Sequence, residues 1–213
     1  VDGTTAVALV FTFLQEIGHT NIDYYIPDRY LEGYGISYKA IDYAAEHGFG
    51  LVIALDCGIK AIEKVKKAKA LGVDFIICDH HRPDTELPPA VAILDSKRPD
   101  CNYPFKELSG CGVGFKLIQA LSKEKHLPFE NIIKYLDLVV VSIASDIVPI
   151  TGENRILAYF GLKIINSRPR AGFEAILKFS NIQRLPHEPT NGKVKTVDAN
   201  IFNRELSISD LVF

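Results

Sequence analysis

One strand can be recognised directly in the sequence, at Phe75-Ile76-Ile77-Cys78-Asp79-His80-His81. Its apolar and partly β-branched half is typical of a strand buried on both faces of a parallel sheet. The strand then ends in one carboxylate and two adjacent imidazoles. Open α/β sheets bind ligands at the carboxyl ends of their strands. These three residues are therefore either part of a ligand site or a polar loop with two surface histidines, and the neighbouring segments decide between the two.

The segments around this strand alternate between strands and helices. Strands are expected at 22–26, 51–55 and 91–94, and helices at 6–18, 37–47 and 60–71. Thr4 or Thr5 is the expected N-cap of the first helix, and Gly18 its end. The alternation predicts an α/β fold in which helices cover both faces of a parallel sheet. Because the chain opens on a helix, the first strand of the fold is expected upstream of Val1.

After residue 110 the pattern changes to consecutive helices, expected at 113–125, 129–148, 154–165 and 173–179. Residues 181–200 are polar, include two prolines and have no period, which is typical of a loop or connection. The predicted organisation is an α/β core over residues 1–150, a helical extension over 151–180, and a loop or connecting segment over 181–213.

Composition limits the class of protein. At 213 residues and 47% hydrophobic content, the chain can bury a large core. Its formal net charge of -2 gives no general attraction for nucleic acid, so an anionic substrate would need local cations or a bound metal. The four cysteines form no C-x-x-C pair, which indicates reduced thiols and a cytoplasmic protein. No apolar run reaches the roughly 18 residues of a membrane span.

Acidic residues stand at the ends of several predicted elements. Asp56 follows the strand at 51–55, and Asp2 stands where an upstream strand would end. Parallel strands bring their carboxyl ends to one edge of the sheet, so these acids and Asp79-His80-His81 are expected there together. Asp146 lies late in a nearly all-apolar helix and needs a partner, because a buried unpaired carboxylate is costly.

Each acid also has a purely structural interpretation. Asp2 could be a helix cap, Asp56 an Asx-turn and Asp146 a cap near the break at Pro149. Each is reasonable singly, but all of them together beside two histidines indicate a site.

A divalent cation would relieve the repulsion between crowded carboxylates. Oxygen ligands with one imidazole suit Mn²⁺ or Mg²⁺ better than Zn²⁺, for which thiolates or several imidazoles are expected. Cys57 and Cys78 could recruit Zn²⁺, but side chains adjacent along a strand point to opposite faces. We therefore expect a Mn²⁺ or Mg²⁺ site.

Four short motifs resemble, in order and spacing, those of the DHH phosphoesterases. They are Val1-Asp2-Gly3, Ala54-Leu55-Asp56-Cys57-Gly58, Cys78-Asp79-His80-His81 and Ser142-Ile143-Ala144-Ser145-Asp146. The stretches at 25–35 and 108–114 are similar to the RecJ branch of this family, bacterial exonucleases that degrade single-stranded DNA from 5' to 3'. The resemblance covers nearly the whole chain, most strongly residues 1 to 165.

The resemblance implies roles for the acids and for His80. Asp56 would bridge two metal ions, and Asp2, His80 and Asp146 would complete the shell of one of them. The implied reaction is in-line attack on a phosphodiester by metal-activated water, in which Asp56, His80 and Asp146 are catalytic.

The resemblance also implies roles for three residues that do not bind metal. His81 would be catalytic and face the scissile phosphate, and Asp79 would orient the histidines. Arg29, in the first RecJ-like stretch, would grip a DNA phosphate, since guanidinium geometry matches phosphate oxygens. Arg29 could instead be an ordinary exposed loop arginine.

Relatives of this kind carry further motif-one acids before Val1 and a second domain of the DHHA1 type after Phe213. We therefore expect this chain alone to bind at most one metal well and to be nearly inactive. Expected partners are single-stranded DNA, a single-strand-binding protein and a helicase, with the protein a monomer active in DNA repair and recombination. The alternatives are a phosphodiesterase for short oligonucleotides or cyclic dinucleotides and a catalytically silent scaffold in a replication complex.

Overall fold

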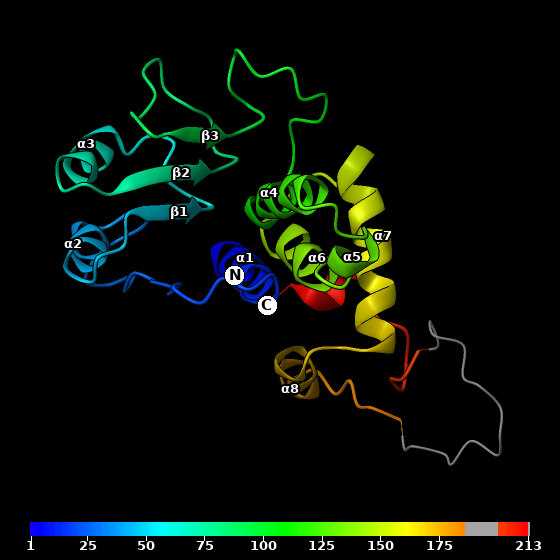
Figure 1. Cartoon of the computed structure of the whole chain (residues 1–213). Coiled ribbons are helices and arrows are strands. Elements are labelled where there is room, and N and C mark those ends of the chain that lie inside the picture. Colours follow the sequence, from blue (N-terminus) through cyan, green and yellow to red (C-terminus); the bar gives the residue numbers. More distant parts are fainter. Residues whose placement is uncertain (186–199, 213) are drawn as a thin grey trace.

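The sheet has three parallel strands in the order β1-β2-β3. They are β1 (Leu51–Leu55), β2 (Asp74–Cys78) and β3 (Ala92–Leu94) in the computed structural model, which describes residues 1–185 and 200–212. The register pairs Leu55 with Cys78 and Cys78 with Leu94. The three strands therefore end together at one edge (Figure 1), and the predicted parallel sheet is confirmed.

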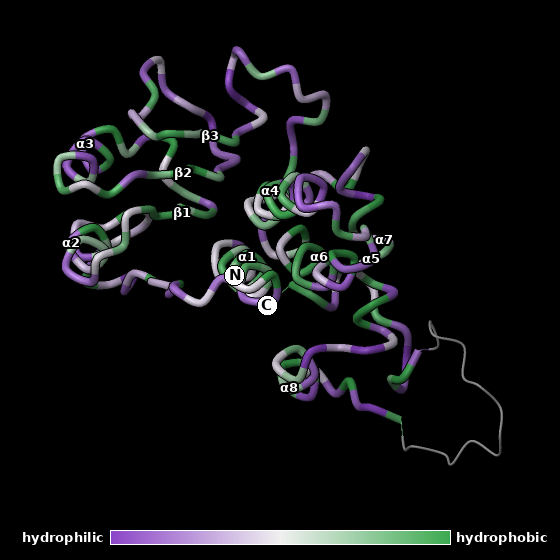
Figure 2. The backbone as a smooth tube through the Cα atoms, viewed as in Figure 1, coloured by the Kyte–Doolittle hydropathy of each residue, from purple (hydrophilic) through white to green (hydrophobic). Residues whose placement is uncertain are grey.

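Helices cover both faces of this sheet, as predicted. α2 (Tyr38–Glu46) and α3 (Ile62–Ala70) lie on one face, where Ile41 and Val65 are buried with Phe75 and Ile77. α1 (Asp2–Glu16) and α4 (Gly110–Glu124) lie on the other face and share a core with Cys78. Apolar residues follow the strands and the inward sides of these helices (Figure 2), because burial of apolar surface drives the layering.

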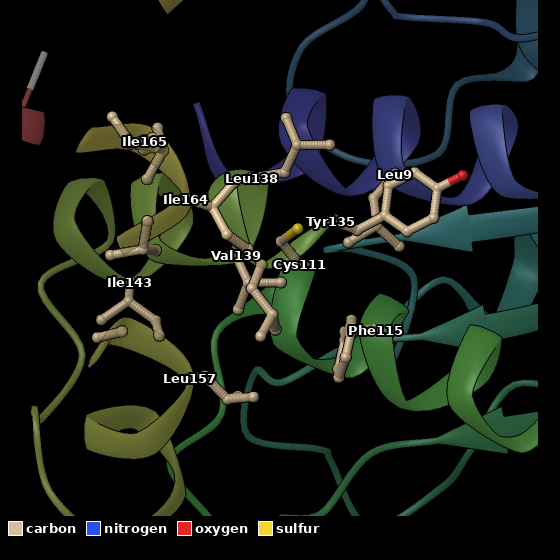
Figure 3. Close-up of a cluster of buried hydrophobic side chains, with 14 of the residues drawn as sticks. Leu9, Cys111, Phe115, Tyr135, Leu138, Val139, Ile143, Leu157, Ile164 and Ile165 are labelled. Atoms are coloured by element: carbon tan, nitrogen blue, oxygen red, sulfur yellow. The ribbon is translucent and has the colours of Figure 1, made fainter. Parts of the chain in front are cut away.

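The second half of the chain is helical around α6. Its helices are α5 (Glu130–Ile133), α6 (Leu136–Ser145), α7 (Gly152–Ser167) and α8 (Ala171–Phe179). α6 is buried from Leu136 to Ala144, and Figure 3 shows Val139 and Ile143 of α6 among Leu9 of α1, Phe115 of α4 and Leu157 of α7. α7 approaches α6 closely because Gly161 has no side chain, since a Cβ there would lie 2.3 Å from the Leu136 carbonyl oxygen.

Several helix boundaries differ from the prediction. α1 begins at Asp2, and Thr4 and Thr5 lie inside its first turn, where their hydroxyls donate to Val1 O and Asp2 O. The helix predicted at 129–148 is divided into α5 and α6, and α6 ends with Asp146 as its C-cap. α4 begins at Gly110 rather than at 113, because Asp2 from α1 accepts hydrogen bonds from its first amides.

The strand predicted at 22–26 is wrong, because the structure has no strand there. A strand needs a hydrogen-bonded neighbour, and this segment is not paired with β1. Instead, both line a groove of about 1610 Å³ whose walls include Phe11, Leu14, Tyr24, Leu51, Ile53 and Leu121. The apolar side chains of residues 22–26 thus line a groove without the backbone pairing that defines a strand.

The described end of the chain packs against the helical half. Phe202, Leu206 and Leu211 are buried there, and Asn166 of α7 accepts a hydrogen bond from Leu206 N at 2.7 Å. A short 3-10 helix, η1 (Ile208–Leu211), lies against α6. Much of the loop predicted at 181–200 lies outside the described residues, and the domain boundaries stay a prediction. Within residues 1–185 and 200–212, no helix has both the length and the apolarity needed to cross a membrane.

Candidate metal centre

Two strand ends bring Asp56 and His80 together. The Asp56 amide continues the ladder by donating to Cys78 O at 2.9 Å, and the chain then turns at Asp56 with φ of 59°. This left-handed conformation is uncommon for a residue other than glycine and is held here by neighbouring structure. His80, which follows β2, is 5% exposed, and its Nε2 lies 3.2 Å from Asp56 Oδ1. The two strand ends therefore bring an imidazole and a carboxylate into contact.

Two helix ends complete the cluster. Asp2 lies in the first turn of α1, with Oδ2 3.7 Å from His80 Nε2. Asp146 is the C-cap of α6, with Oδ2 3.6 Å from the same nitrogen. One imidazole nitrogen therefore faces three carboxylates from β1, α1 and α6, and potential ligand atoms of Asp2, His80 and Asp146 lie within 4.8 Å of one another.

The carboxylates of this cluster lie close together without a lysine or arginine to balance their charge among the described residues. Burial raises the pKa of Asp56 and of Asp146, and the Asp2 carboxylate raises both further. Burial alone would lower the pKa of His80, but the nearby carboxylates outweigh it and raise this pKa. Among the described residues no lysine or arginine forms an ion pair with these acids, and neither ring nitrogen of His80 has a well-formed hydrogen bond. A divalent cation fits this donor set.

Asp79 holds the second histidine. Its Oδ1 accepts hydrogen bonds from the His81 ring Nδ1 at 2.7 Å and from the backbone amides of His80 and His81, and its Oδ2 accepts one from Ile59 N. These bonds lower the pKa of Asp79 despite its burial, and the Asp79 carboxylate raises the pKa of His81. Asp79 thus orients the His81 ring directly but touches His80 only through its backbone.

His81 presents its other nitrogen to the open side of the site. Its Nε2 lies 3.5 Å from the Tyr34 hydroxyl, which itself donates to Asp56 O at 2.7 Å. The Arg29 guanidinium lies over the Tyr34 ring at 5.2 Å, so the structure brings Arg29 to the rim. The groove beside β1 opens onto the same place, since Asp56, His81, Tyr34 and Arg29 are among its lining residues.

Asp2 is a helix cap as well as a member of the cluster, but it caps a distant helix. Its carboxylate accepts hydrogen bonds from Gly110 N and Cys111 N of α4, both at 2.8 Å, and from Ser142 Oγ at 2.6 Å. The sequence suggested a helix cap without indicating which helix. Three donors instead fix the carboxylate in the site, so the two interpretations of Asp2 are compatible.

Sequence reasoning gave no role to the glycines packed on Asp56. A Cβ on Gly110 would lie 2.5 Å from Asp56 Oδ1, and one on Gly3 would lie 3.2 Å from Asp56 Oδ2. The signal was present, because glycine is unfavourable in a helix unless a close approach requires it. Ser109 was also missed; its hydroxyl bonds to Ser142 Oγ at 2.6 Å and caps Gly112 N.

The cysteines do not join the cluster within the described residues. The groups of side chains that could hold a metal there are Asp56, His80 and His81, and Asp2, His80 and Asp146. Burial raises the pKa of the Cys57 thiol to about 12, which disfavours the thiolate that Zn²⁺ would need. The donor set is therefore carboxylate and imidazole, as the sequence predicted.

The chain is similar to known proteins both in sequence and in structure. The model of the DHH family, N-terminal domain, matches residues 1–143. The single-stranded-DNA-specific exonuclease RecJ of Bacillus subtilis is 44% identical over 179 residues, which are 84% of this chain and 22% of that protein. A crystal structure of exonuclease RecJ bound to manganese has a TM-score of 0.72 and 31% identity, over 84% of this chain and 44% of that one.

A third similar protein is RecJ from Thermus thermophilus in complex with Mg²⁺, with a TM-score of 0.54 and 25% identity over 84% of this chain and 21% of that one. The chain thus spans less than half the length of each of these three relatives.

Proposed function

The chain belongs to the DHH family, and from this we propose that it is the core of a metal-dependent exonuclease that hydrolyses single-stranded DNA. The observation that carries the proposal is His80 Nε2 facing the carboxylates of Asp56, Asp2 and Asp146 at 3.2 to 3.7 Å. The relatives named as single-stranded-DNA-specific exonucleases, and their structures with Mn²⁺ or Mg²⁺, support it.

Asp2, Asp56, His80 and Asp146 are the proposed ligands of Mn²⁺ or Mg²⁺. Such a cation supplies a Lewis acid for the phosphodiester and activates water. The residues' own contribution is a fixed geometry, because Asp2 is held by three donors and Asp56 by the turn after β1. Asp56 lies near both His80 and His81 and would contribute its carboxylate to the metal site of a longer protein.

His81 and Arg29 are the proposed phosphate contacts. Asp79 holds the His81 ring through Nδ1 and raises its pKa, which favours the doubly protonated ring whose Nε2 would donate to a phosphate oxygen on the open side. Arg29, beside Tyr34, adds a second positive group for the DNA backbone. Asp79 is the supporting residue that keeps His81 in place.

The remaining features of the proposal concern a longer protein. The groove has apolar walls and faces β1, as a further parallel strand would require, and this supports a strand joined to Val1. A DHHA1-type domain after residue 213 would complete the DNA channel, and this chain alone would be nearly inactive. The RecJ resemblance supports five further proposals for the longer protein. It would digest DNA from 5' to 3', act as a monomer, lie in the cytoplasm, work in repair and recombination, and contact a single-strand-binding protein and a helicase.

The test uses the longer protein with 5'-phosphorylated single-stranded DNA and Mn²⁺. Asp56→Ala should abolish release of mononucleotides, while Asp74→Asn, an exposed acid at the opposite end of β2, should leave it unchanged. Equal degradation by Asp56→Ala would refute the proposal. Faster turnover of dinucleotides than of long strands would indicate a phosphodiesterase for short oligonucleotides. Absence of both Mn²⁺ binding and hydrolysis would indicate a catalytically silent scaffold.

A further inference from the structure

The first turn of α7 connects the two loops that lead to the metal centre. Asn154 lies in this turn and is fully buried. Its Nδ2 donates to Glu107 O at 2.6 Å and to Pro149 O at 3.0 Å. One amide group therefore joins two backbone segments that are far apart in the sequence.

Each of these carbonyls is close in sequence to a residue of the site. Pro149 comes three residues after Asp146, and Glu107 comes three residues before Gly110. Gly110 donates to Asp2 and packs on Asp56, whereas Asp146 faces His80. The Asn154 hydrogen bonds therefore connect the loop that follows Asp146 with the segment that precedes Gly110, in addition to the direct bond from Ser142 of α6 to Asp2.

The loop after Asp146 is not fixed by its own conformational preference. Ile147 has φ of 57°, a left-handed conformation that is strained for a β-branched residue, and its side chain is 83% exposed. An exposed side chain cannot stabilise this turn by packing, so the restraint comes from elsewhere. Val148 packs against the core, and the hydrogen bond from Asn154 to Pro149 O restrains the backbone one residue further on.

The contact depends on hydrogen-bond donors in particular. Asn154 Oδ1 is buried and has no hydrogen-bond partner among the described residues, so only the amide nitrogen is used. The same turn is fixed independently by Glu153, which accepts from Tyr103 Oη at 2.7 Å and pairs with Lys116 of α4. Asn154 is therefore presented to the loops by a turn that is already attached to the core.

We propose that Asn154 is a positioning residue of the metal centre, which it acts on through the Asp146 loop and the Ser109–Gly110 turn. The proposal rests on the metal-binding function proposed above. It assigns to Asn154 no contact with metal or substrate. Its effect should appear in metal affinity, because supporting hydrogen bonds around metal ligands typically change affinity by about 10- to 100-fold.

The experiment measures Mn²⁺ affinity of the chain by calorimetric titration, with urea unfolding in parallel. Asn154→Asp keeps the shape but replaces the two donors by an acceptor facing two carbonyl oxygens. We expect it to weaken Mn²⁺ binding about tenfold in protein that is still folded. Asn166→Asp is the matched control, since Asn166 is a buried asparagine of the same helix that donates to Leu162 O and Leu206 O at the opposite end. It should lower stability and leave Mn²⁺ affinity within about twofold.

Each other outcome counts against the proposal. Unchanged Mn²⁺ affinity in Asn154→Asp, or an equal loss in Asn166→Asp, would show that Asn154 serves general stability only. If Asn154→Asp does not fold, Asn154→Ala removes the donors without adding charge, and failure of both to fold would overturn the positioning role. Absence of Mn²⁺ binding by the unmodified chain would overturn the proposed function and this inference with it, whereas normal binding with unaffected variants would overturn the inference alone.

Discussion

The two ends of helix α6 each carry one aspartate, and the two are treated differently. Asp137, in the first turn, is 2% exposed; its Oδ1 accepts from Leu138 N at 2.8 Å and its Oδ2 from Arg170 Nε at 2.6 Å. Asp146, the C-cap, faces His80 and has no ion pair with lysine or arginine among the described residues. The helix dipole favours an acid at the first end and disfavours one at the second.

The two aspartates differ in what surrounds their carboxylates. Burial raises the pKa of both aspartates, but Arg170 opposes this at Asp137, whereas the Asp2 carboxylate adds to it at Asp146. Asp137 is thus satisfied within the chain. Asp146 is unfavourable in the metal-free protein, which is expected of a ligand kept for a cation.

Replacing the acid at the functional end should have the largest effect. In the longer protein, Asp146→Asn should reduce Mn²⁺-dependent hydrolysis of single-stranded DNA by about a thousandfold, because a metal ligand is lost. In the metal-free chain the same change should raise the free energy of unfolding slightly, by about 0.5 kcal/mol, since it removes repulsion and an acid at a helix C-terminus. Nuclease assays and urea unfolding measure the two. If Asp146→Asn lost activity and also lowered the stability of the metal-free chain, Asp146 would stabilise the fold as Asp137 does, which would contradict the difference drawn between them.

Removing the positive charge of Arg170, which pairs with Asp137 at the first turn of α6, should lower stability without changing metal binding. Arg170→Met should lower the free energy of unfolding by about 3 kcal/mol, because Asp137 stays buried without its partner. Methionine can still cover the Tyr135 ring that Arg170 now contacts. Urea unfolding and Mn²⁺ titration are the measurements.

The double variant Asp137→Asn/Arg170→Met is the control, and it should recover most of the loss because no charge is left unpaired. If the double variant were as unstable as Arg170→Met, packing of the arginine and not its charge would hold this end of α6.

A smaller effect is expected from a methyl group placed against Asp56. Gly110→Ala would bring a Cβ to 2.5 Å from Asp56 Oδ1, so the carboxylate must move. Mn²⁺ affinity should fall about tenfold by titration. Gly114→Ala, in the same helix, is the control, since its Cβ would make ordinary contacts of 3.5 Å or more. Equal affinity in both variants would mean that Asp56 has freedom that the structure does not indicate.

The smallest effect is a difference in pH dependence. The pKa of Asp146 is raised above its ordinary value of 3.8, so the native state holds this proton more tightly than the unfolded chain does. Between 3.8 and the raised pKa, stability therefore falls as pH rises. Without divalent cations, the chain should lose stability relative to Asp146→Asn as the pH rises from 3.8 towards the raised pKa, measured by urea unfolding. A difference that grows in the opposite direction would contradict the assigned cause of the shift.

The sequence alone predicted the parts of the site that depend on local pattern. A buried strand followed by Asp79-His80-His81, and another followed by Asp56, are visible because strand length and apolar runs are local properties. Parallel topology then requires these ends to share an edge. The same reasoning failed at residues 22–26, since a strand also needs a neighbouring backbone that the apolar pattern cannot supply.

Tertiary structure alone decided which partner each acid received. Asp2 caps α4 from more than a hundred residues away, Arg170 reaches Asp137 from another helix, and Asn154 joins two loops. Such pairings depend on how helices pack, and packing is set by the whole core and not by spacing along the chain. The sequence therefore predicted which residues could form a site, and the fold determined that Asp137 pairs with an arginine whereas Asp146 faces His80 beside other carboxylates.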